Sequence, residues 1–295
     1  MLKTLSKPIY VIFLLPLLLS PAWYAWGGAF LLFVGFVPLL ALEENLRKQN
    51  KKRTLWKFWG YSYLALLLWN ISTTWWVWNS SPEGTIAMLL INSLFMSFFW
   101  LLFAVFRKKL PENISLYTFA ILWLSFEFLH LNWDLSWTWL NLGNGFAYTP
   151  QWVQWYEYTG VLGGTLWVLL ANIFCYELLK ELNKKHIIKL AIIIFLPIVI
   201  SYIIFYTYQE KGEEVEIIVV QPNVDPYSEK FVGQEKFIPY AQQADILLNL
   251  LQKELSPETK LVLFPETAFD EGYNESLIKV YTPIQKLLSF TQKYP

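Results

Sequence analysis

The sequence has very little cysteine, histidine or charge. Its 295 residues include one cysteine, Cys175, and two histidines, His130 and His186. One cysteine excludes an internal disulfide and a cysteine-based metal site, and two distant histidines do not form a metal-binding motif. Only 16% of the residues are charged, the net charge is zero, and no basic stripe suggests nucleic acid. We therefore expect no metal, no cofactor and no nucleic-acid partner.

Apolar and aromatic residues are abundant instead. The chain is 55% apolar and contains 16 Trp, 17 Tyr and 22 Phe. Nearly all the long apolar runs lie within residues 9–207, whereas residues 208–295 have the composition of a soluble protein. This contrast predicts an α-helical transmembrane domain over residues 1–207, followed by a water-soluble domain over residues 208–295.

The apolar runs predict about seven membrane spans. The first two are short and separated at Ser20-Pro21. We favour this pair over a signal peptide, because a second apolar run follows at once and no A-x-A cleavage site follows the first. The predicted spans cover residues 9–20, 23–42, 58–78, 85–106, 115–131, 162–179 and 187–207.

The positions of lysine and arginine predict the orientation of these spans. With seven spans, every cation of the first 207 residues falls on the same side, and the opposite loops 79–84 and 132–161 contain none. The positive-inside rule then places the N-terminus in the cytoplasm. An odd number of spans places residues 208–295 outside the cytoplasm.

The cation-free loop 132–161 is rich in aromatic residues. The simpler interpretation is an aromatic belt at the level of the lipid headgroups. The alternative is that part of the loop lines the access route of a lipid substrate. Just before the loop, Glu127 and His130 share a helix face, and we expect both to reach water at the interface. Cys175 is expected to be a small buried apolar residue.

The soluble domain shows strands that alternate with helices. Residues 215–220 predict a strand, residues 237–255 an amphipathic helix, residues 261–264 a second strand, and Asn274 caps a further helix. This order predicts a largely parallel sheet. Two strands and two helices bury too little surface for a complete α/β domain, so we expect the domain to continue beyond residue 295.

Glu266 follows the second predicted strand. The apolar run 261–264 predicts a strand buried on both faces, and Pro265 ends its ladder because proline has no N–H to donate. Sheets of this type place catalytic groups outside the carboxyl ends of their strands. A dry strand end would raise the basicity of the carboxylate. We therefore expect Glu266 to act as a general base, and the simpler alternative is a solvated surface residue.

Two segments of the soluble part resemble the apolipoprotein N-acyltransferase family. They are V-V-Q-P-N at residues 219–223 with Lys230-Phe231 downstream, and L-F-P-E-T-A at residues 263–268. That family joins a multi-span membrane domain to a carbon–nitrogen hydrolase (nitrilase-like) domain of αββα-sandwich fold outside the membrane. The resemblance implies that the chain is an N-terminal fragment, located in a bacterial plasma (inner) membrane with its soluble part in the periplasm.

The resemblance also implies a Glu-Lys-Cys triad in which Glu266 accepts the proton. No residue here matches the family's lysine or cysteine, and Cys175 does not match, so we expect this chain alone to be inactive. Asn223, Lys230 and Phe231 are candidate substrate-binding residues, and Phe231 stands where the family usually has Trp. Their simpler roles are a strand cap for Asn223 and a loop cation near anionic headgroups for Lys230.

The implied reaction is the last step of lipoprotein maturation. An acyl chain moves from a phospholipid, through a cysteine thioester, to the N-terminal amine of the diacylglyceryl-cysteine of an apolipoprotein. Two other classes stay open. One is a different membrane-tethered nitrilase-type amidase, with water or ammonia as the acyl acceptor. The other is a transporter or a structural membrane protein, although a transporter should show internal repeats, and the sequence shows none.

Overall fold

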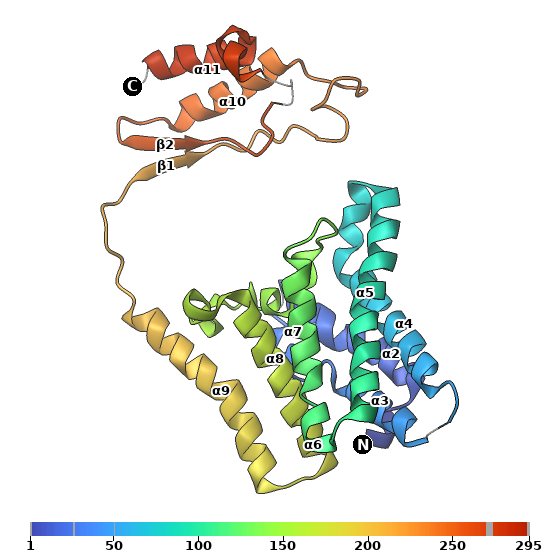
Figure 1. Cartoon of the computed structure of the whole chain (residues 1–295). Coiled ribbons are helices and arrows are strands. Elements are labelled where there is room, and N and C mark those ends of the chain that lie inside the picture. The colour runs from blue at the N-terminus through green and yellow to red at the C-terminus, as the bar shows by residue number, and fades with distance from the viewer. Residues whose placement is uncertain (1, 26, 50, 270–273, 294–295) are drawn as a thin grey trace. The chain divides into compact units, whose positions relative to one another are not determined.

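The chain divides into two compact units, Met1–Tyr208 and Gln209–Pro295 (Figure 1). A computed structural model describes residues 2–25, 27–49, 51–269 and 274–293. We call the two parts unit 1 and unit 2.

Unit 1 is a bundle of helices (Figure 1). Its α-helices are α1 Leu2–Leu5, α2 Pro8–Leu19, α3 Val37–Gln49, α4 Thr54–Thr74, α5 Pro82–Lys109, α6 Glu112–Ser115, α7 Thr118–His130, α8 Tyr156–Lys180 and α9 Lys184–Thr207. Short 3-10 helices connect them: η1 Ser20–Trp23, η2 Ala29–Phe33, η3 Trp75–Asn79, η4 Thr138–Leu140, η5 Leu142–Phe146 and η6 Pro150–Trp152.

Local capping fixes where two of the long helices begin. The Ser81 side chain accepts a hydrogen bond from the backbone N–H of Gly84 at 3.1 Å, and Pro82 occupies the first position of α5. The Asn183 side chain accepts from the backbone N–H of His186 at 2.9 Å at the start of α9. Such side chains satisfy N–H groups that have no partner within the first helical turn. Proline has no N–H, so at this position it costs the helix no hydrogen bond.

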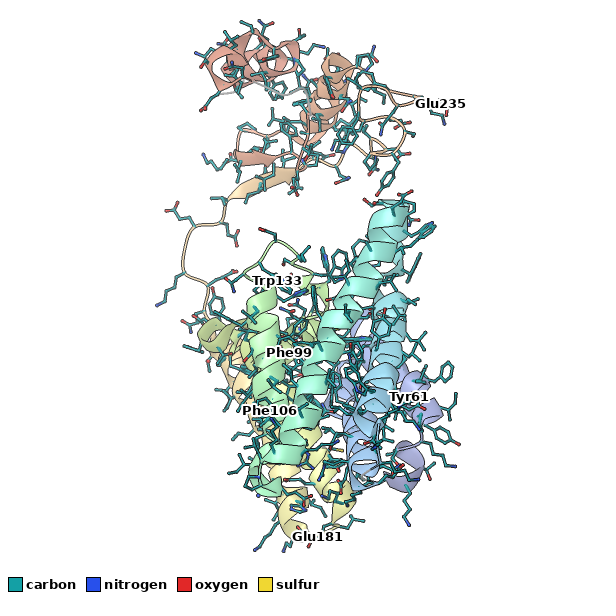
Figure 2. All side chains as sticks on the ribbon, turned by 45° about the vertical axis from the view of Figure 1, so that its right-hand side comes forward. Tyr61, Phe99, Phe106, Trp133, Glu181 and Glu235 are labelled. Atoms are coloured by element: carbon teal, nitrogen blue, oxygen red, sulfur yellow. The ribbon has the colours of Figure 1, made fainter. Side chains whose placement is uncertain are left out.

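Several helices of unit 1 are long and apolar enough to cross a membrane. Among the described residues these are the segment 29–49, which contains α3, together with α5, α8 and α9. Only 6% of the most apolar stretch of α9 is buried. Apolar side chains also project outward from other helices, such as Phe106 of α5 at 38% exposed (Figure 2). Lipid is the solvent that such a surface requires, so unit 1 is a membrane domain.

Each of the seven predicted spans overlaps a helical segment of unit 1. The α2–η1 segment and α7 are apolar but shorter than the four candidate spans, and α4 is not among those four. Seven crossings and their orientation therefore stay a prediction.

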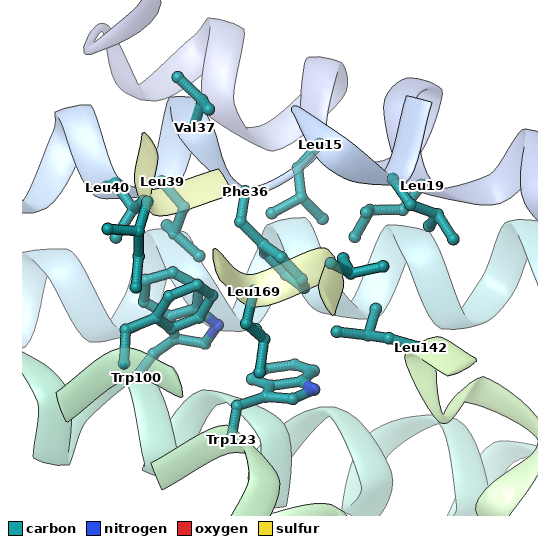
Figure 3. Close-up of a cluster of buried hydrophobic side chains, with 14 of the residues drawn as sticks. Leu15, Leu19, Phe36, Val37, Leu39, Leu40, Trp100, Trp123, Leu142 and Leu169 are labelled. Atoms are coloured by element: carbon teal, nitrogen blue, oxygen red, sulfur yellow. The ribbon is translucent and has the colours of Figure 1, made fainter. Parts of the chain in front are cut away.

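Aromatic rings form the centre of unit 1 (Figure 3). Phe36 is fully buried, and its ring centroid lies 5.0 Å from that of Trp123, 5.5 Å from Phe119, 5.6 Å from Trp100 and 6.3 Å from Trp69. The partner rings come from α4, α5 and α7. Phe36 directly precedes α3, so it joins α3 to these three helices in one core. Edge and tilted arrangements of this kind add to the stabilisation from area burial alone.

A buried asparagine supplies hydrogen bonds where η2 gives way to α3. Asn172 of α8 accepts from the backbone N–H of Phe36 at 2.8 Å and donates to the carbonyl of Leu32 at 2.7 Å. It also donates to Val168 at 2.8 Å. Backbone groups in this irregular segment would otherwise be buried without partners, which is costly in an apolar environment.

Unit 2 has the order predicted from its sequence. Strand β1 Glu216–Val219 and strand β2 Thr259–Leu263 pair in parallel, with Val219 opposite Leu263. Helix α10 Tyr240–Glu254 connects them, and η7 Glu275–Val280 and α11 Thr282–Lys293 follow. Asn274 caps the last segment by accepting from the backbone N–H of Ser276 at 3.0 Å, but that segment begins as a 3-10 helix.

The prediction that residues 261–264 form a strand buried on both faces is wrong for the described residues. Leu261 is 47% exposed and Leu263 is 44% exposed, and Val219 of β1 is 72% exposed. The alternate side chains Val262 and Phe264 pack against the core of Val220, Leu247 and Leu251. The helical layer therefore covers one face of the sheet and leaves an apolar open face.

Candidate functional site

A cavity of about 210 Å³ lies at the carboxyl ends of β1 and β2. Its lining residues come from the segments that follow the two strands and from α10: Gln221, Pro222, Val224, Pro226, Lys230, Gln243, Leu247, Pro265 and Ala268. Parallel strands end at the same edge of a sheet, and that edge is where α/β proteins bind ligands.

The backbone is strained at equivalent positions after both strands. The pairing of Val219 with Leu263 continues as a hydrogen bond from the N–H of Val220 to the carbonyl of Leu263 at 2.9 Å. Four residues beyond the paired positions, Asn223 has φ 55° and Thr267 has φ 53°. Asparagine tolerates this left-handed region, but a β-branched threonine there costs roughly 1–3 kcal/mol. Strain of this kind is typical of functional sites.

Glu266 directly precedes this strained threonine in the sequence and does not itself line the cavity. Its neighbour Pro265 lines the cavity, as does Ala268 two residues later, and the Glu266 side chain is exposed. The expectation of a dry strand end around this carboxylate is therefore wrong for the described residues, because the sheet edge is open to solvent. A carboxylate in this position can accept a proton from a group that enters the cavity.

Lys230 lies in the cavity wall, and Asn223 and Phe231 lie next to it. Lys230 is itself a lining residue, whereas Asn223 is an exposed residue between the lining residues Pro222 and Val224. The Lys230 ammonium is 5.7 Å from the centroid of the Phe231 ring, and Phe231 does not line the cavity. A cation at this distance is attracted to the face of the ring.

Gln243 holds the loop that carries Lys230, and it was not among the residues predicted from the sequence. Its side chain is 3% exposed and donates to the carbonyl of Lys230 at 3.0 Å and to that of Ile238 at 2.7 Å. The available signal was its position, since Gln243 follows Tyr240 by three residues and precedes Leu247 by four on the buried face of α10. A glutamine within an apolar helix stripe indicates a buried amide that needs partners.

Unit 1 contains a buried carboxylate that the sequence analysis placed wrongly. Glu127 of α7 is 1% exposed and does not reach water. One carboxylate oxygen accepts from the indole N–H of Trp123 and from the backbone N–H of Leu142, both at 2.9 Å. The other accepts from the Thr165 hydroxyl at 2.5 Å. These donors replace solvent and come from α7 itself, from the segment that follows it, through Leu142, and from α8, through Thr165.

His130 is also buried, at 1% exposed, so its predicted access to water is wrong as well. Its Nδ1 lies 2.9 Å from the indole nitrogen of Trp133, and its Nε2 lies 2.9 Å from the backbone nitrogen of Trp137. A neutral imidazole has one acceptor nitrogen, so one of these contacts at a time is a hydrogen bond. Glu127 and His130 together attach the aromatic loop to the helical bundle.

The aromatic loop combines buried and exposed rings. Phe146 is 1% exposed and stacks on Trp167 of α8 at 5.0 Å between ring centroids, whereas Trp139 is 57% exposed and Tyr148 is 56% exposed. Cys175 is 9% exposed within α8, as expected of a small buried residue.

The described residues define a class of protein: a polytopic α-helical membrane protein that carries a small parallel α/β unit. A family model described as the apolipoprotein N-acyltransferase N-terminal domain matches residues 15–174. The chain therefore belongs to the apolipoprotein N-acyltransferase family.

Two curated relatives have the name apolipoprotein N-acyltransferase. The protein of Chlorobaculum tepidum is 26% identical over 275 residues, which cover 90% of this chain and 50% of the relative. The protein of Coxiella burnetii is 29% identical over 221 residues, which cover 65% of this chain and 45% of the relative. The chain spans about half the length of the curated relatives it matches.

Proposed function

We propose that this chain provides the membrane domain and the first part of the catalytic domain of a lipoprotein N-acyltransferase. The enzyme transfers an acyl chain from a phospholipid to the N-terminal amine of a diacylglyceryl-cysteine on an apolipoprotein. The observation that carries this proposal is family membership over residues 15–174, together with Glu266 directly after Pro265, which lines the cavity at the strand ends.

Glu266 is the general base in this proposal. A cysteine thiol is mostly protonated at neutral pH, so it needs a base to become a nucleophile. Glu266 takes the thiol proton, and the thiolate attacks the ester carbonyl of the phospholipid. The thioester forms as the lysophospholipid leaves with that proton. The lipoprotein amine then attacks the thioester, gives up one proton, and releases the thiol with its proton restored.

The thiol and the oxyanion-stabilising lysine are not matched by any residue of this chain. Cys175 is buried in α8 of unit 1, and the family pattern does not include it. Lys230 lines the cavity, so in our proposal it contacts the anionic substrate rather than completing the triad. Asn223 and Phe231 contribute to the same substrate-binding edge. The 295-residue chain alone is therefore expected to be inactive.

The membrane arrangement in the proposal has seven spans, with unit 2 on the periplasmic side of a bacterial inner membrane. The orientation is supported by the cation-bearing ends of α3, α5 and α8, which lie together. Arg107 of α5 lies 3.4 Å from Glu43 of α3, and Lys180 of α8 lies 3.3 Å from Glu44 of α3. In the same proposal, unit 2 is the first part of a nitrilase-like sandwich. Its open apolar sheet face is suited to a second layer.

The experiment is a substitution in the longer protein to which, in this proposal, the chain contributes, expressed in a bacterium depleted of its native N-acyltransferase. Glu266→Gln keeps the size of the side chain and removes its basicity. We expect the acylated lipoprotein N-termini detected by mass spectrometry to fall by roughly a hundredfold or more. Normal N-acylation in the Glu266→Gln variant would contradict the assignment of the base.

The matched control is Glu258→Gln, which changes an exposed glutamate in the turn before β2. We expect this variant to retain full N-acylation. Free fatty acid is measured in the same samples, because an amidase-type enzyme that uses water as the acceptor would release fatty acid without acylating the lipoprotein.

A further inference from the structure

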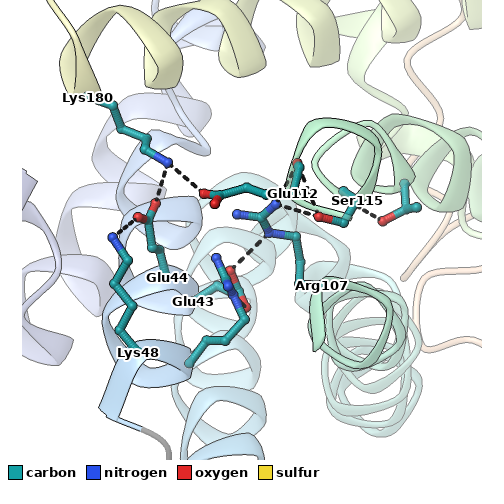
Figure 4. Close-up of polar contacts among 9 residues, drawn as sticks. Glu43, Glu44, Lys48, Arg107, Glu112, Ser115 and Lys180 are labelled. Atoms are coloured by element: carbon teal, nitrogen blue, oxygen red, sulfur yellow. Dashed lines mark hydrogen bonds and ion pairs between the residues drawn. The ribbon is translucent and has the colours of Figure 1, made fainter. Parts of the chain in front are cut away.

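Charged residues from four helices meet at one end of unit 1 (Figure 4). Arg107 is buried and lies 3.4 Å from Glu43, and its guanidinium donates to the Ser115 hydroxyl at 2.7 Å. Lys180 lies 3.3 Å from Glu44 and 3.0 Å from Glu112. Arg47 and Lys48 add further cations that pair with Glu43 and Glu44.

A cavity of about 350 Å³ lies beside this cluster. Three of its lining residues are lysines, Lys3, Lys48 and Lys180, and Glu44 is the one carboxylate among them. Positive charge is therefore in excess at the cavity wall. An anion is the complementary ligand for such a wall.

Lys3 is the lysine with spare charge. In the part of the chain that the structure describes, its ammonium has no ion-pair partner, whereas Lys48 and Lys180 both contact Glu44. The backbone around Lys3 is held in place, because the Ser6 hydroxyl donates to the Lys3 carbonyl at 3.1 Å and Asn45 of α3 donates to that hydroxyl at 3.1 Å. The folded chain thus holds the backbone of this lysine beside the cavity.

Tyr176 supplies a second, independent observation. It lines the same cavity, is 1% exposed, and its hydroxyl has no hydrogen-bond partner among the described residues. A buried hydroxyl without a partner costs free energy, and a ligand oxygen in the cavity would satisfy it. The Lys180 ammonium lies 5.7 Å from the centroid of the Tyr176 ring, and both residues line the cavity.

We infer that this cavity binds the phosphate group of an anionic phospholipid. Lys3 neutralises the phosphate directly, Lys48 shares its charge between Glu44 and the phosphate, and the Tyr176 hydroxyl donates to one of the phosphate oxygens. The site is in unit 1, apart from the cavity at the strand ends of unit 2, and its lipid is a bound structural ligand rather than the acyl donor.

A lipid fits the surroundings better than free phosphate does. The cavity wall also includes the apolar side chains Leu2 and Ala41. Next along the chain, α2 exposes apolar side chains that suit acyl chains, with Ile9 at 58%, Phe13 at 54% and Leu17 at 67% exposed. Basic pockets between membrane helices are known binding sites for anionic headgroups.

The test uses the purified full chain in nonionic detergent and native mass spectrometry. The added probes, at equal concentrations, are dioleoylphosphatidylglycerol, dioleoylphosphatidylcholine and inorganic phosphate. We expect phosphatidylglycerol to be retained with roughly tenfold higher affinity than phosphatidylcholine. The double variant Lys3→Gln/Lys48→Gln should lose that preference.

The matched control is Lys7→Gln/Lys52→Gln, which removes the same charge from residues outside the cavity lining. This control should weaken phosphatidylglycerol binding less than about twofold, because exposed charges are screened by salt and contribute little. Tyr176→Phe retains the ring and removes one oxygen, so it should weaken binding roughly threefold even if the lysine double variant proves unstable.

Three results would overturn the inference. The first is an equal loss of binding in the control and the lysine double variant, which would indicate diffuse charge attraction. The second is unchanged binding in Tyr176→Phe. The third is inorganic phosphate that occupies the site and excludes phosphatidylglycerol, which would make a soluble anion the ligand.

Discussion

Glu127 accepts a hydrogen bond from the backbone N–H of Leu142, fifteen residues away, at 2.9 Å. This contact joins the end of α7 to η5 of the aromatic loop. Thr165 of α8 donates to the same carboxylate and also accepts from the backbone N–H of Gly143 at 3.1 Å. A single buried acid thus joins two helices and the loop between them.

Removing this acid should destabilise the membrane domain. Glu127→Ala leaves the indole of Trp123, the N–H of Leu142 and the hydroxyl of Thr165 without their acceptor, and we expect a loss of roughly 3 kcal/mol in unfolding free energy. Glu127→Gln keeps one acceptor oxygen and should cost less. Thermal unfolding in detergent, followed by tryptophan fluorescence, measures both. Glu157→Ala changes an exposed glutamate of the same region and is the control; equal losses in Glu127→Ala and Glu157→Ala would contradict the assigned role.

Gly143 should not tolerate a side chain. An added Cβ would lie 2.1 Å from the carbonyl oxygen of Val161, and the Tyr156 hydroxyl already donates to the Gly143 carbonyl at 2.9 Å. We expect Gly143→Ala to destabilise unit 1 by roughly 1–3 kcal/mol through overpacking. Gly60→Ala is the control, because a Cβ there meets nothing within 4 Å and alanine is the better helix former in α4. The two variants should shift the unfolding temperature in opposite directions.

Gln243 should control the order of the loop that carries Lys230. Gln243→Glu replaces the donating amide with an oxygen that faces the carbonyls of Lys230 and Ile238, which repel it. We expect hydrogen exchange over residues 226–238 to speed up by at least roughly tenfold, because two buried hydrogen bonds are lost and a carboxylate takes the place of their donor. Gln242→Glu, one residue earlier and exposed, carries the same charge change. Unchanged exchange in Gln243→Glu would refute the positioning role.

Glu216 should make the start of the sheet sensitive to acid. The hydrogen bond from the Ser256 hydroxyl, at 2.6 Å, and a second from Thr259 lower the pKa of this carboxyl below its ordinary value. A lowered folded-state pKa means that the stabilisation is present above the unfolded-state pKa and is lost as pH falls through the folded-state pKa. Protection of the amides of β2, corrected for intrinsic exchange, should therefore decrease from about pH 5 to about pH 3. In Glu216→Gln the decrease should be smaller; an identical decrease would show that other groups cause it.

Much of the candidate site could be predicted from the sequence, because it depends on local signals. Pro265 has no N–H to continue a strand ladder, and β2 does end before it, at Leu263. The strand–helix–strand order follows from hydrophobic periodicity and is observed in unit 2. The catalytic role of Glu266 and the substrate-binding roles of Asn223, Lys230 and Phe231 stay predictions, because testing these roles requires a substrate.

The sequence alone determined that this is a membrane protein with a small α/β unit, since composition and periodicity act within a few residues of the chain. Only the tertiary structure decided which polar groups reach water. Glu127 is buried because Leu142 and Thr165 fold onto it, and Arg107 is buried because Glu43, 64 residues earlier, lies within its reach. Leu263 is exposed because the described chain covers one face of its sheet. These outcomes depend on partners distant in sequence, which no local pattern specifies.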